Sequence, residues 1–186
     1  MHRVFKKEQI LTIPNLLSLV RLALIPVIVW LYCVERDRTL AVAIIVLSGI
    51  TDIVDGFIAR HFNMISDFGK ILDPIADKLT QAAVLICLTV RYRLMYALIT
   101  LFAVKELIMA FCGCLVIKKK DVVNSAKWYG KLNTVVLFCV MTTLVLFPNI
   151  PTTAANIMIC ICAVMMLISL FLYTTFYIKL LRDKNS

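Results

Sequence analysis

The sequence has few charged residues for its length. Only 17% of its 186 residues are Asp, Glu, Lys or Arg, whereas 62% are hydrophobic, and the mean hydropathy is +0.94. A soluble domain of this size has too small an interior to bury so much apolar surface. Because backbone amides in hydrocarbon must be hydrogen-bonded within their own segment, the sequence predicts an all-α integral membrane protein.

Several other patterns are missing. The seven cysteines form no Cys-x-x-Cys pair and lie near no His at ligand spacing, so we expect packing thiols rather than a zinc or redox centre. The sequence has no alternation of aromatic and basic residues and no basic tail, which disfavours nucleic acid as a partner. It also has no small-residue cleavage site after its first apolar run, so we expect that span to remain in the mature protein. Without repeats or long linkers, residues 1–186 are predicted to form a single domain.

Six apolar runs are each about long enough to cross a hydrocarbon core of ~30 Å. They cover residues 16–33, 40–59, 72–90, 94–117, 132–147 and 154–178. Carboxylates interrupt the second and third runs, so a hydropathy window underrates them. The sequence therefore predicts a bundle of six transmembrane helices over residues 14–186.

The N-terminal segment, residues 1–13, mixes basic and apolar side chains before Pro14, a residue that suits the first turn of a helix. This mixture predicts a short amphipathic helix on the membrane surface, and a frayed tail is the alternative.

The basic residues are distributed unevenly between the predicted loops. Four arginines fall on one side of the membrane: Arg36, Arg38, Arg91 and Arg93. Thirteen basic residues fall on the other: Arg3, Lys6, Lys7, Arg60, Lys70, Lys118, Lys119, Lys120, Lys127, Lys131, Lys179, Arg182 and Lys184. This bias predicts that both termini and the loop between the second and third spans face the cytoplasm, next to anionic headgroups of the cell membrane.

Four aspartates at the inner ends of the second and third spans are the strongest functional signal, because ionisable residues within membrane helices are costly. Asp52 and Asp55 are three residues apart and Asp73 and Asp77 four apart, so each pair shares a helix face. At ~1.5 Å per residue, Asp52 lies ~12 Å below Arg60 and Asp77 lies ~12 Å below Gly69. In an antiparallel arrangement the two pairs therefore sit at similar depths and can converge. An all-carboxylate set suits Mg²⁺ or Mn²⁺, and two such ions can bridge a phosphate.

A stripe of small residues accompanies the aspartates. Gly49, Gly56 and Ala59 share the face of Asp52. Such a stripe permits close helix packing, and beside carboxylates it also suits a ligand slot. Arg60 at the helix end is able to clamp a phosphate or to extend toward the interface.

The segment 52–77 fits the pattern D-x-x-D-G-x-x-A-R-x8-G-x-x-x-D-x-x-x-D at all eight fixed positions. On this signature the sequence resembles the CDP-alcohol phosphotransferase family, and the similarity in layout extends over nearly the whole chain. The resemblance implies homodimers that carry two divalent ions on Asp52, Asp55, Asp73 and Asp77. It further implies that Asp77 is the general base on the acceptor hydroxyl.

The same resemblance implies where the donor, CDP-diacylglycerol, binds. Together with Asp52, the residues Gly56 and Ala59 would leave room for the cytidine. Arg60 would approach the diphosphate, and Gly69 would open the third helix. The acceptor oxygen would attack the diacylglycerol-linked phosphorus, and CMP would leave.

The acceptor is less strongly indicated. The sequence is most similar to bacterial phosphatidylglycerophosphate synthases, which use glycerol 3-phosphate, and Lys105 and Lys131 are the candidate acceptor-binding residues. Lys105 and Glu106 are a candidate ion pair, and Gly113 stands where those enzymes have a second arginine. The stretch from Gly130 to Thr134 resembles cardiolipin synthases, whose acceptor is phosphatidylglycerol; serine or inositol phosphate acceptors remain further alternatives.

A function of another class is also compatible with membrane carboxylates, namely an ion or proton path through a small transporter. The fixed Gly, Ala and Arg positions have no obvious use in such a path, so the sequence favours the enzyme.

Overall fold

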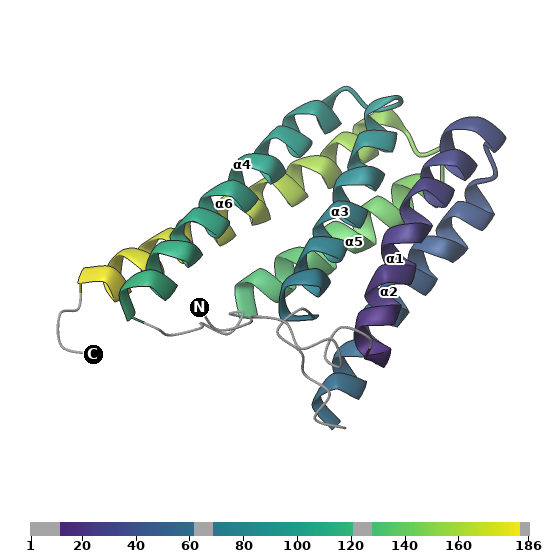
Figure 1. Cartoon of the computed structure of the whole chain (residues 1–186). Helices are drawn as coiled ribbons and strands as arrows, with labels where there is room; N and C mark the ends of the chain where they lie inside the picture. Colours follow the sequence, from purple (N-terminus) through teal and green to yellow (C-terminus); the bar gives the residue numbers. More distant parts are fainter. Residues whose placement is uncertain (1–11, 62–68, 121–127, 183–186) are drawn as a thin grey trace. The chain divides into compact units, whose positions relative to one another are not determined.

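The computed structural model describes residues 12–61, 69–120 and 128–182, most of which are helical, with no strand among them. In chain order the elements are α1 (Ile13–Trp30), the π-helical turn η2 (Leu31–Glu35), α2 (Arg38–His61), α3 (Gly69–Thr89), α4 (Leu94–Lys120), α5 (Trp128–Leu146) and α6 (Thr152–Arg182) (Figure 1). The predicted all-α class is confirmed. The predicted surface helix over residues 1–13 lies almost wholly outside the described residues.

Five of the helices are long and apolar enough to cross a membrane, namely α1 continued through η2, α2, α4, α5 and α6. The third predicted span, α3, does not meet the same criterion because Asp73, Asp77 and Lys78 lie in its first half. Its 21 residues nevertheless give a rod of ~31 Å at 1.5 Å per residue. Length therefore permits α3 to cross the membrane, although its composition is more polar.

The connection between α1 and α2 is very short. η2 is followed by Arg36, whose φ of 59° is left-handed and ends the helix. Asp37 then caps α2, because its Oδ1 accepts a hydrogen bond from the Leu40 amide at 3.0 Å. A two-residue link between helices forces them to run antiparallel, and α1 and α2 do pack side by side (Figure 1).

The chain forms two compact units. The first comprises Met1–Cys87 with Val145–Pro148, and the second comprises Leu88–Leu144 with Asn149–Ser186. In the first unit α1 packs on α2 around buried Ile28, Ala41 and Ile45. In the second unit α4 packs along α6, with Leu98 and Met166 buried (Figure 1).

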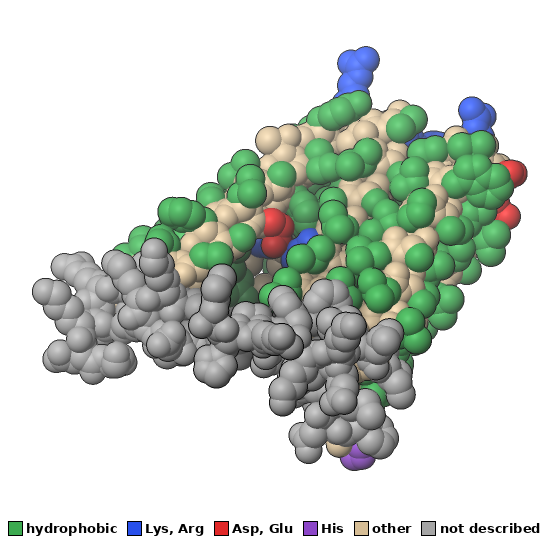
Figure 2. All heavy atoms as spheres, in the orientation of Figure 1, with side chains coloured by type: hydrophobic (Ala, Val, Ile, Leu, Met, Phe, Trp, Pro, Cys, Tyr) green, Lys and Arg blue, Asp and Glu red, His purple; other side chains and the backbone are tan. Residues whose placement is uncertain are grey.

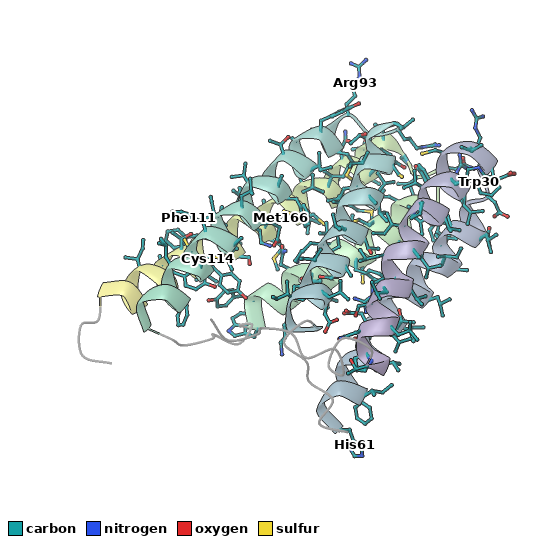
Figure 3. The ribbon with its side chains drawn as sticks, in the orientation of Figure 1. Trp30, His61, Arg93, Phe111, Cys114 and Met166 are labelled. Carbon is teal, nitrogen blue, oxygen red and sulfur yellow. The ribbon has the colours of Figure 1, made fainter. Side chains whose placement is uncertain are left out.

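The outward faces of these helices are apolar. Hydrophobic side chains cover most of the described surface in view, and charged side chains on it are sparse (Figure 2). Phe111 on α4 and Trp30 at the end of α1 are exposed and labelled in Figure 3. Apolar side chains at this density on the outside are expected when the surrounding solvent is lipid. The protein is therefore an integral membrane protein.

The contact between Cys33 of η2 and Cys87 of α3 allows an experimental test of how these two elements pack. The Cys33 and Cys87 sulfur atoms are 3.9 Å apart, whereas a disulfide needs about 2.05 Å. An approach of about 2 Å lies within ordinary side-chain motion, so mild oxidation with copper–phenanthroline is expected to cross-link this pair. Peptide mass spectrometry of the oxidised protein measures the product. Cys33→Ser should abolish it, whereas Cys114→Ser on α4 should not. Failure to cross-link in the folded protein would contradict this part of the fold.

Candidate active site

A single arginine on α1 bridges the two aspartates of α2. Arg21 Nη1 lies 2.5 Å from Asp52 Oδ1, and its Nη2 contacts Asp55 Oδ2. Because Asp52 and Asp55 are three residues apart, both carboxylates face α1, as their spacing predicts. The planar guanidinium presents parallel N–H donors, so one side chain is able to bind two carboxylates at once.

Burial makes this contact important for the fold. The side chains of Arg21 and Asp55 are each only 2% exposed, whereas that of Asp52 is 45% exposed. Removing an ion from water costs several kcal/mol, and an opposite charge with good hydrogen bonds offsets most of that cost. Arg21 and Asp55 therefore neutralise each other inside the first unit, and Asp52 forms the accessible edge of the cluster.

The aspartates of α3 have uncharged partners as their nearest contacts. The Ser18 hydroxyl on α1 donates to Asp73 Oδ1, and the Pro14 carbonyl is a second acceptor for it at 3.1 Å. The Gln81 amide, one turn further along α3, donates to Asp77 Oδ1 at 2.8 Å. Lys78 Nζ is more distant, at 3.7 Å from Asp77 Oδ2. These contacts fix the orientation of both carboxylates.

The two acidic pairs lie within electrostatic range of one another. Asp55 is repelled by Asp52 and by Asp73, and Asp77 is repelled by Asp52 and attracted by Arg21. Four carboxylates from two helices thus share one region of the first unit, where the described residues place Lys78 and the buried Arg21 beside them. This arrangement has an excess of negative charge, which favours cations.

The donor set agrees with hard divalent cations in its chemistry. It consists of carboxylate oxygens, without thiolate or imidazole, and Mg²⁺ and Mn²⁺ prefer oxygen ligands. Within the described ranges, no three Asp, Glu, His or Cys side chains converge closely enough to hold a metal ion. The positive charge between Asp52 and Asp55 is instead that of Arg21. The two predicted cations stay a prediction.

The other predicted donor-binding residues are described in part. Gly56 is half-buried on α2, and Gly69 is buried as the first residue of α3. The side chains of Ala59 and Arg60 lie outside the described part of the chain, although both residues belong to α2. Their predicted contacts with cytidine and diphosphate stay predictions.

The candidate acceptor residues belong to the second unit. Lys105 is buried in α4, and its Nζ is 2.6 Å from Glu106 Oε1, which confirms the predicted ion pair. Lys131 is exposed near the start of α5. Beside it, Gly130 faces the Tyr173 ring of α6, and a Cβ at Gly130 would meet Tyr173 Cζ at 2.9 Å. A side chain at Gly130 would therefore force the Tyr173 ring to move.

Sequence analysis did not identify three of the residues that hold the aspartates, namely Ser18, Arg21 and Gln81. A signal for Arg21 was present, since an arginine within a long apolar run is rare and usually functional. Ser18 is three residues before Arg21 and therefore shares its helix face. Gln81 follows Asp77 by one turn, which is the spacing of a side-chain pair within a helix.

The fold and this site define a multi-helix membrane protein with an acidic polar cluster at the helices that carry the signature. The sequence profile of the CDP-alcohol phosphatidyltransferases matches residues 11–177. The chain belongs to this family, and the resemblance noted from residues 52–77 is confirmed.

Individual relatives carry two kinds of name. A CDP-diacylglycerol–glycerol-3-phosphate 3-phosphatidyltransferase of Rickettsia bellii is 46% identical over 78 residues, which are 41% of this chain and 43% of the relative. A CMP-forming cardiolipin synthase of Streptomyces coelicolor is 36% identical over 114 residues, 58% of this chain and 53% of the relative. A cardiolipin synthase–hydrolase fusion protein of Schizosaccharomyces pombe is 38% identical over 103 residues, 55% of this chain and 17% of the relative. The chain thus spans about half or less of these relatives.

The unequal burial of Asp52 and Asp55 gives a stability prediction. Asp55→Asn leaves the buried Arg21 charge with one partner, and breaking a buried pair costs about 3–5 kcal/mol. Asp52→Asn removes a half-exposed partner, and a cost of roughly 1 kcal/mol is expected. Thermal unfolding in detergent with EDTA should therefore show a much larger fall in Tm for Asp55→Asn. Equal falls for the two variants would contradict the assigned burial.

Proposed function

We propose that this protein transfers the phosphatidyl group of CDP-diacylglycerol to glycerol 3-phosphate, giving phosphatidylglycerophosphate and CMP. The observation that carries the proposal is the group of four aspartates at the signature positions of the family, oriented by α1 and by Gln81. The name of the Rickettsia relative supports glycerol 3-phosphate as the acceptor.

The proposed setting is the cytoplasmic membrane. Residues 1–186 form one catalytic domain, and α3 crosses the membrane together with the five apolar helices. The positive-inside bias supports a cytoplasmic location for both termini and for the aspartates. The donor has a wet headgroup and buried acyl chains, so a polar site near the inner interface is where a water-soluble acceptor meets it. Two copies of the chain associate as a homodimer.

The proposed chemistry uses the aspartates in two ways. Asp52, Asp55, Asp73 and Asp77 hold two cations, Mg²⁺ or Mn²⁺, which when bound offset the charge of the diphosphate and of departing CMP. Asp77 accepts the proton of the acceptor hydroxyl as its oxygen forms a bond to the diacylglycerol-linked phosphorus. The bond from that phosphorus to the CMP oxygen breaks, and CMP leaves with the bonding electron pair. The Gln81 amide keeps the Asp77 carboxylate oriented for this step.

The donor and acceptor are bound by other side chains. Gly56, Ala59, Arg60 and Gly69, together with Asp52, bind the CDP-diacylglycerol headgroup. Lys105 and Lys131 bind the phosphate of the acceptor, for which their charge is suitable. The Streptomyces and fission-yeast relatives favour one second candidate, cardiolipin synthase with phosphatidylglycerol as the acceptor.

A panel of acceptors tests the reaction and separates the two candidates. Purified protein with Mg²⁺ or Mn²⁺ and CDP-diacylglycerol is offered glycerol 3-phosphate, phosphatidylglycerol, serine or inositol phosphate, and CMP release is measured. Release is expected with glycerol 3-phosphate and little with the others. Release with phosphatidylglycerol alone would assign a cardiolipin synthase, and none with any acceptor would count against the enzyme.

The proposed general base gives a second prediction. Asp77→Asn keeps the shape of the side chain but removes its ability to accept a proton, so kcat should fall at least about a hundredfold. Circular dichroism and Tm should change little, because Asp77 is half-exposed and an asparagine oxygen also accepts the hydrogen bond from Gln81. Asp37→Asn, the same substitution next to the start of α2, is the matched control and should keep most of the activity, because an asparagine oxygen also accepts the Leu40 amide hydrogen bond. Full activity of Asp77→Asn would remove Asp77 from the base role.

A further inference from the structure

We propose that Arg21 is a positioning residue that acts as a built-in cation, competing with the divalent ions for Asp52 while it stays paired with Asp55. This inference rests on the proposed function, since it concerns the same aspartates. The arginine holds the two carboxylates side by side while the divalent ions are absent. It yields Asp52 when a cation binds and remains the counter-ion of Asp55.

The contacts of Arg21 support the first part of the proposal. Its two terminal nitrogens each contact a different aspartate of α2, and its buried Nε has no hydrogen-bond partner. Within the described part of the chain, these two carboxylates are the groups that hold the guanidinium, and an unpartnered buried donor has a cost. A side chain anchored in this way shifts readily once one carboxylate has a better cation.

The unequal exposure of the aspartates supports the second part. A cation from the aqueous phase reaches the half-exposed Asp52 carboxylate before that of Asp55, which is buried with Arg21. The contact between Arg21 and Asp52 is therefore the one that opens, because water and cation replace it at little cost. The contact with Asp55 is retained, because separating it would leave two charges buried without partners.

Competition of this kind has a direct consequence for affinity. A positive charge beside a cation site weakens cation binding through repulsion and occupies a ligand oxygen. Removing that charge should tighten binding, whereas a merely structural arginine would, when removed, loosen the ligands and weaken binding. The direction of the change in Kd thus distinguishes the two roles.

Direct measurement of Mn²⁺ binding tests the proposal. Full-length protein in detergent is freed of metal with EDTA, desalted and titrated with Mn²⁺, with free Mn²⁺ followed by electron paramagnetic resonance. Arg21→Gln keeps a polar side chain without charge and should lower the Kd roughly tenfold. Arg21→Lys keeps the charge but cannot bridge two carboxylates, so it should lower the Kd by a smaller factor. Asp52→Asn, which removes a ligand, should raise it.

A second readout uses stability in the same variants. Without metal, Arg21→Gln leaves Asp52 and Asp55 repelling each other, so its Tm in EDTA should fall below that of the wild type. Mn²⁺ should raise the Tm of Arg21→Gln more than it raises the wild-type Tm. If Arg21→Gln does not fold without metal, the Kd and the Tm are both measured on Arg21→Lys instead. An unchanged or raised Kd in the folded arginine variants would overturn the proposal.

The outcomes also separate this inference from the proposed function. If the wild type binds Mn²⁺ and releases CMP while the arginine variants bind Mn²⁺ no more tightly, only the role of Arg21 is wrong. If no variant binds Mn²⁺ and the wild type makes no CMP, both the enzyme and the competition are wrong.

Discussion

The need to neutralise charge inside an apolar bundle is the constraint on which the candidate site depends. Asp55 is buried on α2, and the fold offers it Arg21 from α1 as a buried counter-ion. In a low-dielectric interior neither ion is stable without the other. This pairing fixes the rotation of α1 against α2, and Ser18, one turn before Arg21, then reaches Asp73 on α3. Helix α1 carries none of the signature residues, yet it orients carboxylates on α2 and α3, which carry them.

Much of the fold followed from the sequence because apolar run length is a strong signal in membrane proteins. The predicted runs 40–59 and 94–117 agree with α2 and α4 except at their ends. α5 begins at Trp128, before its predicted start at residue 132. Trp128 and Lys131 are suited to the membrane–water interface, so the helix extends beyond its apolar run. The π-helical turn η2 was not foreseen, because periodicity does not reveal one inserted residue at the end of a helix.

The four aspartates of the candidate site were predictable from the sequence. Arg21 also carried a signal, as an arginine in an apolar run, but the contacts of the aspartates with Arg21 and Ser18 were not predictable. Asp52, Asp55, Asp73 and Asp77 stand at fixed spacings that single out one helix face each. Predicting those contacts required knowing which face of α1 meets α2. Apolar residues occur on every face of α1, so the hydropathy pattern does not identify the face that packs. Lys105 and Glu106 were identifiable because the two members of that ion pair are adjacent in sequence.

The choice of acceptor has a different physical basis from the transfer step. The same chain matches relatives named for glycerol 3-phosphate and relatives named for cardiolipin, so the features common to all of them do not select the acceptor. In the proposed reaction the aspartates act on the donor phosphate and on the hydroxyl proton, which every acceptor alcohol has in common. Discrimination between acceptors requires groups that bind the rest of the acceptor. A site rejects the wrong substrate when that substrate leaves the polar groups of the site without partners. For the proposed reaction the candidates for that task are the buried Lys105, whose charge is paired with Glu106, and the exposed Lys131. Because Gly113 supplies no second basic side chain on α4, an anionic acceptor would depend more strongly on these two lysines.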